Sequence, residues 1–290
     1  MLLNHKLVLG TVQFGLPYGI NNTKGQTEKE EVFKILQSAQ KNAINTLDTA
    51  PAYGNSMETL GEFFKHSNSF SVISKFHGKT EKEIVGSVDK QLKVLNRTSL
   101  DVLLFHSYKD WLENPSTISV LDKIKQEQKV GKIGISLYTN DEFLSAIESG
   151  LFDVIQIPFN ILDNYSLKGS LIEKAKNKGV EVHTRSVFLQ GLFFKSIETL
   201  PAFFSPLKEA LSKIHTLCAD NNLSVHELAL LYVLHQSNIK RVLIGVETEK
   251  QLLMNIEVLK KDISISLIQE INNIKIEEID LLNPVTWPKS

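Results

Sequence analysis

Short apolar runs rich in β-branched residues alternate along the chain with longer segments of helical periodicity. Within each run the apolar residues are nearly continuous, which is typical of strands that are covered on both faces. The predicted strands span residues 7–11, 44–49, 70–76, 101–107, 132–138, 154–160, 180–186 and 241–246. The predicted helices span residues 27–42, 56–66, 80–95, 117–130, 140–149, 166–178, 204–220, 224–236, 248–260 and 263–277.

The strict alternation of strands and helices predicts a parallel sheet. Eight strand–helix units in 290 residues favour closure into a (β/α)8 TIM barrel, which typically needs about 250 residues. An open dinucleotide-binding sheet would carry G-x-G-x-x-G after its first strand, and the chain has no such motif. No linker or composition shift divides the chain, so we expect one α/β barrel domain over residues 1–290.

Composition limits the class of protein. The chain is 42% hydrophobic and 22% charged with a formal net charge of −1, which gives no electrostatic footprint for nucleic acid or an anionic membrane. Its single cysteine, Cys218, excludes an internal disulfide and a multi-cysteine metal site, and we predict no metal. The first residues do not resemble a signal peptide and no run of about 18 apolar residues occurs, so we predict a cytoplasmic protein.

Polar residues at the carboxyl ends of the predicted strands are the candidates for chemistry, because active sites of such barrels lie at this end. The second strand ends in Asp48 with Tyr53 in the following loop, the third strand ends in Lys75, and the fourth in His106. Each residue alone is compatible with a structural role, such as a turn cap or a buried core histidine. Together they bring an acid, a phenol, an amine and an imidazole to one rim, which predicts a catalytic site.

This combination is typical of proton donation to an oxygen that gains negative charge. A free tyrosine has a pKa of about 10, and an ammonium group at Lys75 favours the phenolate, so we expect the pKa of Tyr53 to move down toward neutrality. Asp48 would hold Lys75 and keep it charged, while His106 would donate a hydrogen bond to a substrate carbonyl oxygen. Hydride addition to a carbonyl produces that charge, and since no side chain supplies hydride, a nicotinamide cofactor is predicted.

Two further strand ends suit that cofactor. Ser136 and Gln156, at the ends of the fifth and sixth predicted strands, are suited to bind its carboxamide group.

Over residues 7 to 260 the chain resembles an aldo-keto reductase. The stretches that carry the resemblance are LGTVQFG, DTAPAYGNSMETLG, ISKF, LLFHS, GKIGIS, IQIPFN, SVFLQGLF and IGVETEKQLLMNI. The resemblance implies reduction of aldehydes or ketones with Tyr53 as general acid. The residues it implies are Asp48, Tyr53, Lys75 and His106 for catalysis, Ser136 and Gln156 for the carboxamide, Ser186 to Gly191 for the pyrophosphate, and Gly245, Gln251 and Asn255 for the adenosine end.

The sequence departs from the family pattern at both ends of the expected cofactor site. Leu137 replaces an Asn that often follows the carboxamide-binding Ser, and Arg185 stands where many members carry an aromatic that stacks on the nicotinamide. Arg185 either favours reduced cofactor or binds an anionic group of the substrate. At the 2′-phosphate position Gly245 and Gln251 replace the usual cations.

Glu247 adds negative charge near the same position. The predicted cofactor is NADPH, with only a slight preference over NADH.

The substrate is predicted only as a small carbonyl compound. The loops 13–26 and 107–115 and the tail 283–290 are expected to form the walls of its pocket, with Tyr18, and with Trp111 and Trp287 unless these two only pack against helices. The long glycine-bearing first loop resembles that of bacterial members associated with sugar metabolism, so we expect a polar, hydroxylated substrate. The sequence gives no prediction of the oligomeric state.

Two other functions remain open from the sequence. Lys75 is also compatible with a Schiff-base nucleophile in an aldolase-type barrel, although the Asp48–Tyr53 motif would then have no explanation. The potassium-channel β-subunits use the same barrel as a regulatory module that binds cofactor, and the intact set of four catalytic residues argues against that function.

Overall fold

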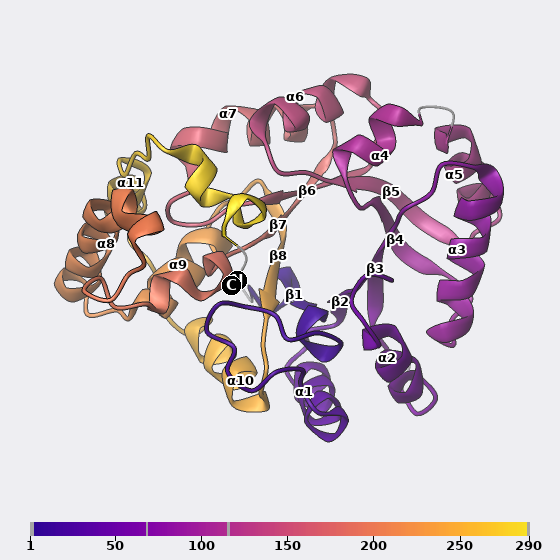
Figure 1. Ribbon diagram of the computed structural model, residues 1–290, viewed down its shortest axis with the longest axis horizontal. Coiled ribbons are helices and arrows are strands. Elements are labelled where there is room, and N and C mark those ends of the chain that lie inside the picture. Colours follow the sequence, from indigo (N-terminus) through magenta and orange to yellow (C-terminus); the bar gives the residue numbers. More distant parts are fainter. Residues whose placement is uncertain (1–2, 68, 115–116, 289–290) are drawn as a thin grey trace.

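A computed structural model describes residues 3–67, 69–114 and 117–288. Within them eight parallel strands close into a barrel in the order in which they occur along the chain (Figure 1). The strands are β1 (Leu7–Gly10), β2 (Thr46–Asp48), β3 (Ser71–Phe76), β4 (Leu100–Phe105), β5 (Val130–Ser136), β6 (Val154–Pro158), β7 (Glu181–Arg185) and β8 (Ile239–Gly245). The predicted (β/α)8 barrel is therefore confirmed.

Helices surround the barrel on its outside (Figure 1). The α-helices are α1 (Lys29–Lys41), α2 (Ser56–Phe64), α3 (Glu81–Val94), α4 (Tyr108–Glu113), α5 (Thr117–Gln126), α6 (Asn140–Ser149), α7 (Tyr165–Asn177), α8 (Lys208–Asp220), α9 (Val225–Leu234), α10 (Glu249–Val258) and α11 (Ile265–Asn272). The 3-10 helices are η1 (Leu3–Lys6), η2 (Val12–Phe14), η3 (Leu189–Phe194), η4 (Ala202–Leu207), η5 (Ile279–Leu282) and η6 (Pro284–Thr286).

The sequence did not predict helix α4, and it extended the next helix too far. Helix α5 ends at Gln126 because Gln128 adopts a φ of 59° and β5 begins at Val130, so the chain turns before the predicted end at residue 130. Several helices begin at a side-chain cap. In α6, for example, Thr139 and Glu142 form a reciprocal capping box.

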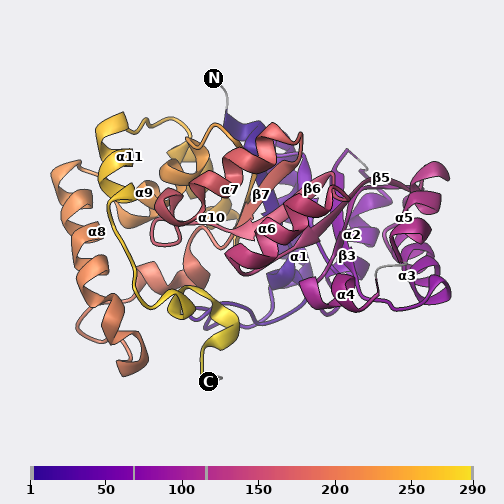
Figure 2. The ribbon, with the colours of Figure 1, turned by 90° about the horizontal axis from the view of Figure 1, so that it is seen from above.

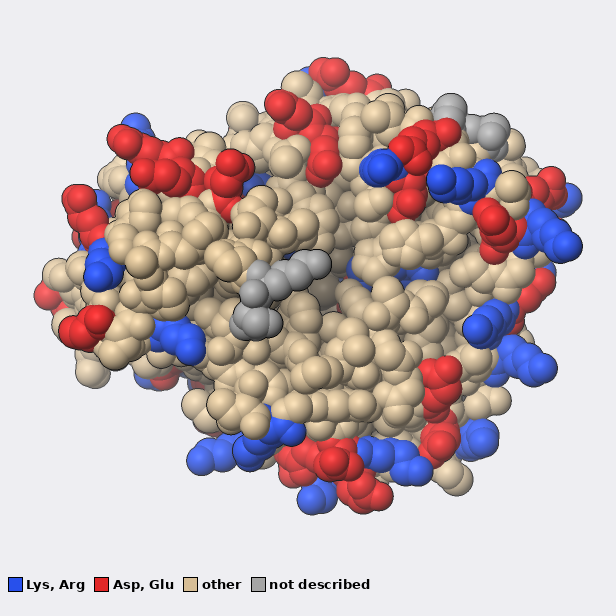
Figure 3. All heavy atoms as spheres, in the orientation of Figure 1, with Lys and Arg blue, Asp and Glu red and all other residues tan. Residues whose placement is uncertain are grey.

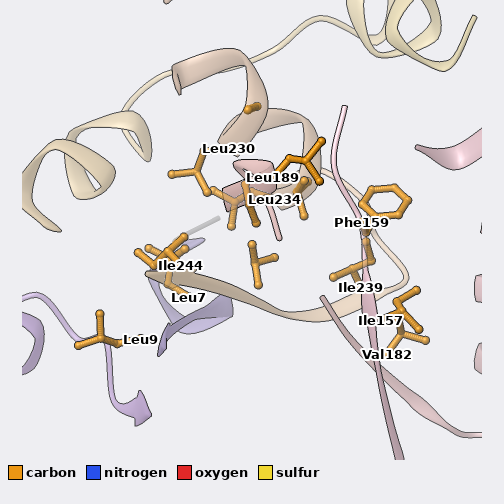
Figure 4. Close-up of a cluster of buried hydrophobic side chains, with 14 of the residues drawn as sticks. Leu7, Leu9, Ile157, Phe159, Val182, Leu189, Leu230, Leu234, Ile239 and Ile244 are labelled. Carbon is orange, nitrogen blue, oxygen red and sulfur yellow. The ribbon is translucent and has the colours of Figure 1, made fainter. Parts of the chain in front are cut away.

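The hydrophobic core has two parts, because successive strand side chains point to opposite faces of the sheet. Inside the barrel Val8, Ile73, Val102, Leu104 and Val154 form a small cluster. Outside it a larger cluster joins the strands to the helices. Figure 4 shows part of this cluster, and its labelled residues are Leu7, Leu9, Ile157, Phe159, Val182, Leu189, Leu230, Leu234, Ile239 and Ile244.

The first and the last described residues lie at opposite ends of the barrel (Figure 2). Residues 13–26, which begin within η2 and precede α1, lie at the same end of the molecule as the last described residues (Figure 2). None of the helices in the described part of the chain is long and apolar enough to span a bilayer.

Candidate active site

A buried ion pair lies at the carboxyl ends of β2 and β3. Lys75 Nζ donates to Asp48 Oδ1, and the two residues are 2% and 1% exposed. The same ammonium also contacts the Thr49 carbonyl oxygen at 3.3 Å, while Gln156 Nε2, from β6, donates to Asp48 Oδ2 at 2.9 Å. Three strands therefore fix the carboxylate and the amine relative to each other, as the sequence predicted for Asp48 and Lys75.

The charge of Lys75 is maintained by its neighbours. Burial alone lowers the pKa of a lysine, because it penalises the charged form. The Asp48 carboxylate and the Tyr53 phenol act in the opposite direction and raise the pKa of Lys75 above its ordinary value. At neutral pH the side chain is therefore an ammonium ion and not a free amine.

Tyr53 lies in the turn after β2, and two glycines determine the conformation of this turn. Gly54 adopts a φ of 55°, and a Cβ atom placed on it would lie 2.1 Å from the Gly15 carbonyl oxygen. A Cβ atom on Gly15 would in turn lie 1.8 Å from the Tyr53 carbonyl oxygen. The two backbones can approach this closely only because neither residue has a side chain, and this contact positions Tyr53.

The phenol of Tyr53 lies close to both of its predicted partners. Lys75 Nζ is 5.0 Å from the centroid of the Tyr53 ring, and the Tyr53 and His106 ring centroids are 6.2 Å apart at an interplanar angle of 82°. Burial raises the pKa of Tyr53, and the Lys75 charge lowers it by less, so the pKa lies above its ordinary value. The predicted fall in this pKa is therefore wrong: Lys75 acts in the expected direction, but burial outweighs it.

His106 follows β4 and is neutral at physiological pH. Burial, together with the charge of Lys75, lowers its pKa to about 3. The His77 ring stacks on the His106 ring with 4.6 Å between the centroids, and His106 Nδ1 is buried without a hydrogen-bond partner among the described residues. A neutral imidazole has one N–H, which suits it to donate a hydrogen bond rather than to provide a charge.

A cavity of about 480 Å³ opens beside these residues. Figure 3 shows the face of the molecule that is hollowed near its centre, with most Lys, Arg, Asp and Glu side chains along the outline. The predicted site residues that line the cavity are Asp48, Tyr53, Gln156, Arg185, Ser186, Gly191, Gly245, Gln251 and Asn255. Lys75, His106 and Ser136 do not line it; Lys75 and Ser136 are buried, and Ser136 is paired with Gln156 in the β5–β6 register.

The first loop crosses the cavity and meets the segment that follows β7. Gln190 Nε2 donates to the Tyr18 hydroxyl at 2.9 Å, Ile20 N donates to the Gln190 carbonyl at 3.1 Å, and Asn21 Nδ2 donates to the Gly191 carbonyl at 2.6 Å. Tyr18 lines the cavity as predicted. The contacts from Gln190 and Asn21 had no signal in the sequence, because they join segments about 170 residues apart.

Trp111 and Trp287, which were predicted to line the substrate pocket, do not line the cavity. Trp111 packs against Tyr108 and Phe152, and Trp287 packs against Phe204 while its indole N–H donates to the Leu281 carbonyl at 2.9 Å. Both side chains are buried against helices, which is the alternative that the sequence left open. Residues 115, 289 and 290 of the predicted walls lie outside the described residues.

Arg185 lines the cavity and is held by the two residues that follow β5. Its Nη2 donates to the Leu137 carbonyl at 2.9 Å, and its guanidinium carbon lies 4.2 Å from the centroid of the Tyr138 ring. Leu137 lacks the side chain of the Asn that it replaces, but its backbone carbonyl binds Arg185. Tyr138 was missed because nothing in the sequence indicates which side chain stacks on which.

Comparison with known proteins identifies the family. Residues 6–276 match the model of the aldo/keto reductase family. The chain belongs to this family.

The relatives of this aldo-keto reductase include enzymes named for acting on a sugar and on an aldehyde. It is 28% identical to L-galactose dehydrogenase of Arabidopsis thaliana, over 98% of this chain and 95% of that one. It is 23% identical to an NADH-specific methylglyoxal reductase of Escherichia coli, over 83% and 86% of the two chains. The fold is that of aldo-keto reductase AKR11C1 from Bacillus halodurans, with a TM-score of 0.75, 20% identity and coverage of 93% and 91%. The chain is therefore an oxidoreductase acting on carbonyl and alcohol groups.

The family uses nicotinamide cofactors, and an unsatisfied acceptor in the cavity of this aldo-keto reductase fits one. Gln156 Oε1 is buried without a hydrogen-bond partner among the described residues, while its Nε2 is engaged by Asp48. A carboxamide NH2 group is the donor that this oxygen lacks. Gln13 Oε1 is a second such acceptor in the lining, one that the sequence did not single out.

Proposed function

We propose that the protein is an NAD(P)H-dependent reductase of aldehydes and ketones, with Tyr53 as general acid. The observation that carries the proposal is the buried Lys75–Asp48 ion pair next to the Tyr53 ring, with neutral His106 beside it. This arrangement provides a proton donor, a cation that stabilises the resulting phenolate, and a hydrogen-bond donor for the same oxygen.

Each residue has a separate part in the proposed reaction. The bound reduced nicotinamide supplies the hydride for the carbonyl carbon. His106 donates a hydrogen bond to the carbonyl oxygen, and Tyr53 transfers its hydroxyl proton to that oxygen as the alkoxide forms. Lys75 stabilises the phenolate that remains, and Asp48 keeps Lys75 charged and in place.

The raised pKa of Tyr53 is compatible with this role. A pKa above the ordinary value keeps the phenol protonated at neutral pH, so the donor is present in every molecule before the reaction. An alkoxide is much more basic than a phenolate, so proton transfer to it stays favourable. The Lys75 charge lowers the free energy of the phenolate as it forms.

The two ends of the cavity differ in the cations that they offer the cofactor. Arg185 lies at the catalytic end, but at the end formed by β8 and α10 the described residues of the lining include Glu247 and Gln251 and neither Lys nor Arg. A 2′-phosphate there would meet a carboxylate without a compensating cation, whereas a carboxylate can accept hydrogen bonds from ribose hydroxyls. We therefore propose NADH as the preferred cofactor, in place of NADPH, as in the E. coli relative named for NADH.

The Schiff-base alternative for Lys75 is disfavoured. A nucleophilic lysine needs a free amine and therefore a lowered pKa, whereas Asp48 and Tyr53 raise the pKa of Lys75. A regulatory module that binds the cofactor without turnover is one outcome of the experiment below, and the cytoplasmic location stays a prediction.

The experiment titrates NADH and NADPH separately by fluorescence and then follows cofactor oxidation with methylglyoxal, butanal and galactose. We expect turnover by the parent, a fall in kcat of about 10²–10⁴-fold in Tyr53→Phe, and unchanged cofactor affinity in that variant. Cofactor binding by the parent without oxidation of any compound would favour the regulatory module. Failure to bind either cofactor would contradict the whole proposal.

A further inference from the structure

Arg185 provides a positive charge in the cavity that no carboxylate of the described residues neutralises. No Asp or Glu side chain lies within ion-pair distance of its guanidinium among residues 3–67, 69–114 and 117–288. The two buried lysines near the site differ from this partly exposed arginine, since Lys75 pairs with Asp48 and Lys168 pairs with Asp163. Because His106 is neutral, the catalytic end of the cavity carries a net charge of about +1.

The guanidinium group extends toward the reacting groups. Its bond to the Leu137 carbonyl reaches past β6 to the residue that follows β5, so the side chain extends along the rim of the barrel in the direction of β4, the strand that His106 follows. From there its charge acts on both groups that face the substrate oxygen, and it contributes to lowering the pKa of Tyr53 and the pKa of His106.

Arg185 also keeps hydrogen-bonding capacity for a ligand. The Leu137 carbonyl accepts one N–H, the Ser186 hydroxyl accepts a second at 3.4 Å, and Tyr138 covers a face of the guanidinium plane. An arginine has five N–H donors, so the remaining ones are free to bind along the edge of the plane. Held in one orientation by these contacts, that edge matches the two oxygens of a carboxylate or a phosphate.

We propose that Arg185 determines substrate specificity, and that the substrate is a carbonyl compound that also carries an anionic group, a carboxylate or a phosphate. This proposal rests on the reductase function proposed above, because it places the carbonyl at Tyr53 and His106 and the anionic group at Arg185. The bound anion neutralises the excess charge of the catalytic end.

The test compares matched pairs of aldehydes that differ in the anionic group. The pair of succinic semialdehyde and butanal tests whether the site recognises a carboxylate. The pair of glyceraldehyde 3-phosphate and glyceraldehyde tests whether it recognises a phosphate. The readout is the ratio of kcat/KM within each pair, which cancels a general change in turnover. We expect the parent to prefer the anionic member of one pair by about 10- to 100-fold, mainly through KM, because a charge-assisted hydrogen bond contributes about 1.5–3 kcal/mol.

In Arg185→Gln we expect this ratio to fall to about one, and in Arg185→Lys to recover partly. Lys82→Gln is the matched control, since it removes an exposed cation from α3 that does not line the cavity, and it should keep the parent ratio. A parent ratio near one in both pairs overturns the proposal. So does an Arg185→Gln variant that binds NADH more weakly but keeps the ratio, because Arg185 would then serve the cofactor.

A binding measurement separates this proposal from the reductase function itself. Butyrate and butanamide are titrated calorimetrically into the parent and into Arg185→Gln, each saturated with NADH. Preference for butyrate that is lost in the variant supports the anion site even if no aldehyde is reduced. Equal affinity for the two compounds, or no binding of either, overturns it, while reduction of neutral aldehydes alone leaves the reductase function in place.

Discussion

The two ends of the cavity are built in different ways. At the catalytic end Asp48, Lys75 and Gln156 come from strand ends, are buried, and are bound to one another. At the other end Glu247 and Gln251 lie at the start of α10, where Gln251 Oε1 accepts from the Glu247 backbone N–H, and both face solvent more than the catalytic residues do. Buried charges must be fixed in pairs, whereas exposed ones can be exchanged at little cost. We therefore expect changes at the first end to affect both folding and turnover, and changes at the second to affect mainly selectivity.

The largest effect is expected from Lys75→Met, which leaves the Asp48 carboxylate buried and unpaired. The free energy of unfolding should fall by about 3–5 kcal/mol, and kcat should fall by about 10²–10⁴-fold because the phenolate loses its stabilising cation. Urea denaturation and steady-state kinetics measure the two quantities.

Lys168→Met is a matched control for this variant, because Lys168 on α7 forms an equally buried pair with Asp163 outside the cavity lining. It should lose a similar amount of stability while the folded protein keeps its turnover. Equal kcat in Lys75→Met and Lys168→Met would contradict a catalytic role of the Lys75 charge.

A second variant, Gly54→Ala, tests whether the close backbone contact of Gly15 and Gly54 positions the general acid Tyr53. Gly54→Ala places a Cβ atom 2.1 Å from the Gly15 carbonyl, so the turn that carries Tyr53 must move. A displacement of about 1 Å can cost about 10²-fold in turnover. Gly150→Ala is the control, since Gly150 has a φ of 69° but nothing within 4 Å of an added Cβ. It should lose only about 1–2 kcal/mol of stability and keep kcat, and equal kinetics in both variants would show that the Gly15–Gly54 contact does not position Tyr53.

The same contrast explains what could be predicted from the sequence. Asp48, Lys75 and Gln156 were found because the strand runs indicate where each strand ends, and parallel strand ends converge in a barrel. The close approach of Gly15 and Gly54 and the stacking of Arg185 on Tyr138 could not be predicted from the sequence, since both depend on how loops pack against each other. The direction of the pKa of Tyr53 was wrong for a related reason, because the degree of burial is a property of the whole fold.

A smaller effect is expected from His106 on the pH dependence of stability. Its pKa is about 3 in the folded protein against an ordinary value of 6.5, so the unfolded chain binds more protons between these values. The stabilising contribution is therefore complete above pH 6.5 and is lost as the pH falls toward 3. Urea denaturation over this range should show a smaller loss in His106→Asn than in the parent.

The kinetics of the parent provide a further check of His106. A residue that is already neutral should cause no step in kcat near the ordinary histidine pKa of 6.5. A step there that disappears in His106→Asn would show that the imidazole titrates in the working enzyme, and would contradict its proposed role as a neutral hydrogen-bond donor.

The smallest effect is expected at the far end, from Glu247→Gln. Removing the carboxylate should strengthen NADPH binding relative to NADH by about two- to fivefold, because a charge that solvent reaches contributes only about 0.2–1 kcal/mol. The two dissociation constants are measured by fluorescence titration at low and high salt, and the difference should shrink as salt screens the charge. Glu270→Gln, an exposed carboxylate on α11, is the control and should change neither constant. If Glu247→Gln alters kcat as strongly as it alters the NADPH to NADH ratio, the separation between a catalytic end and a selective end is false, because a half-buried charge at the far end would then act on the buried catalytic residues.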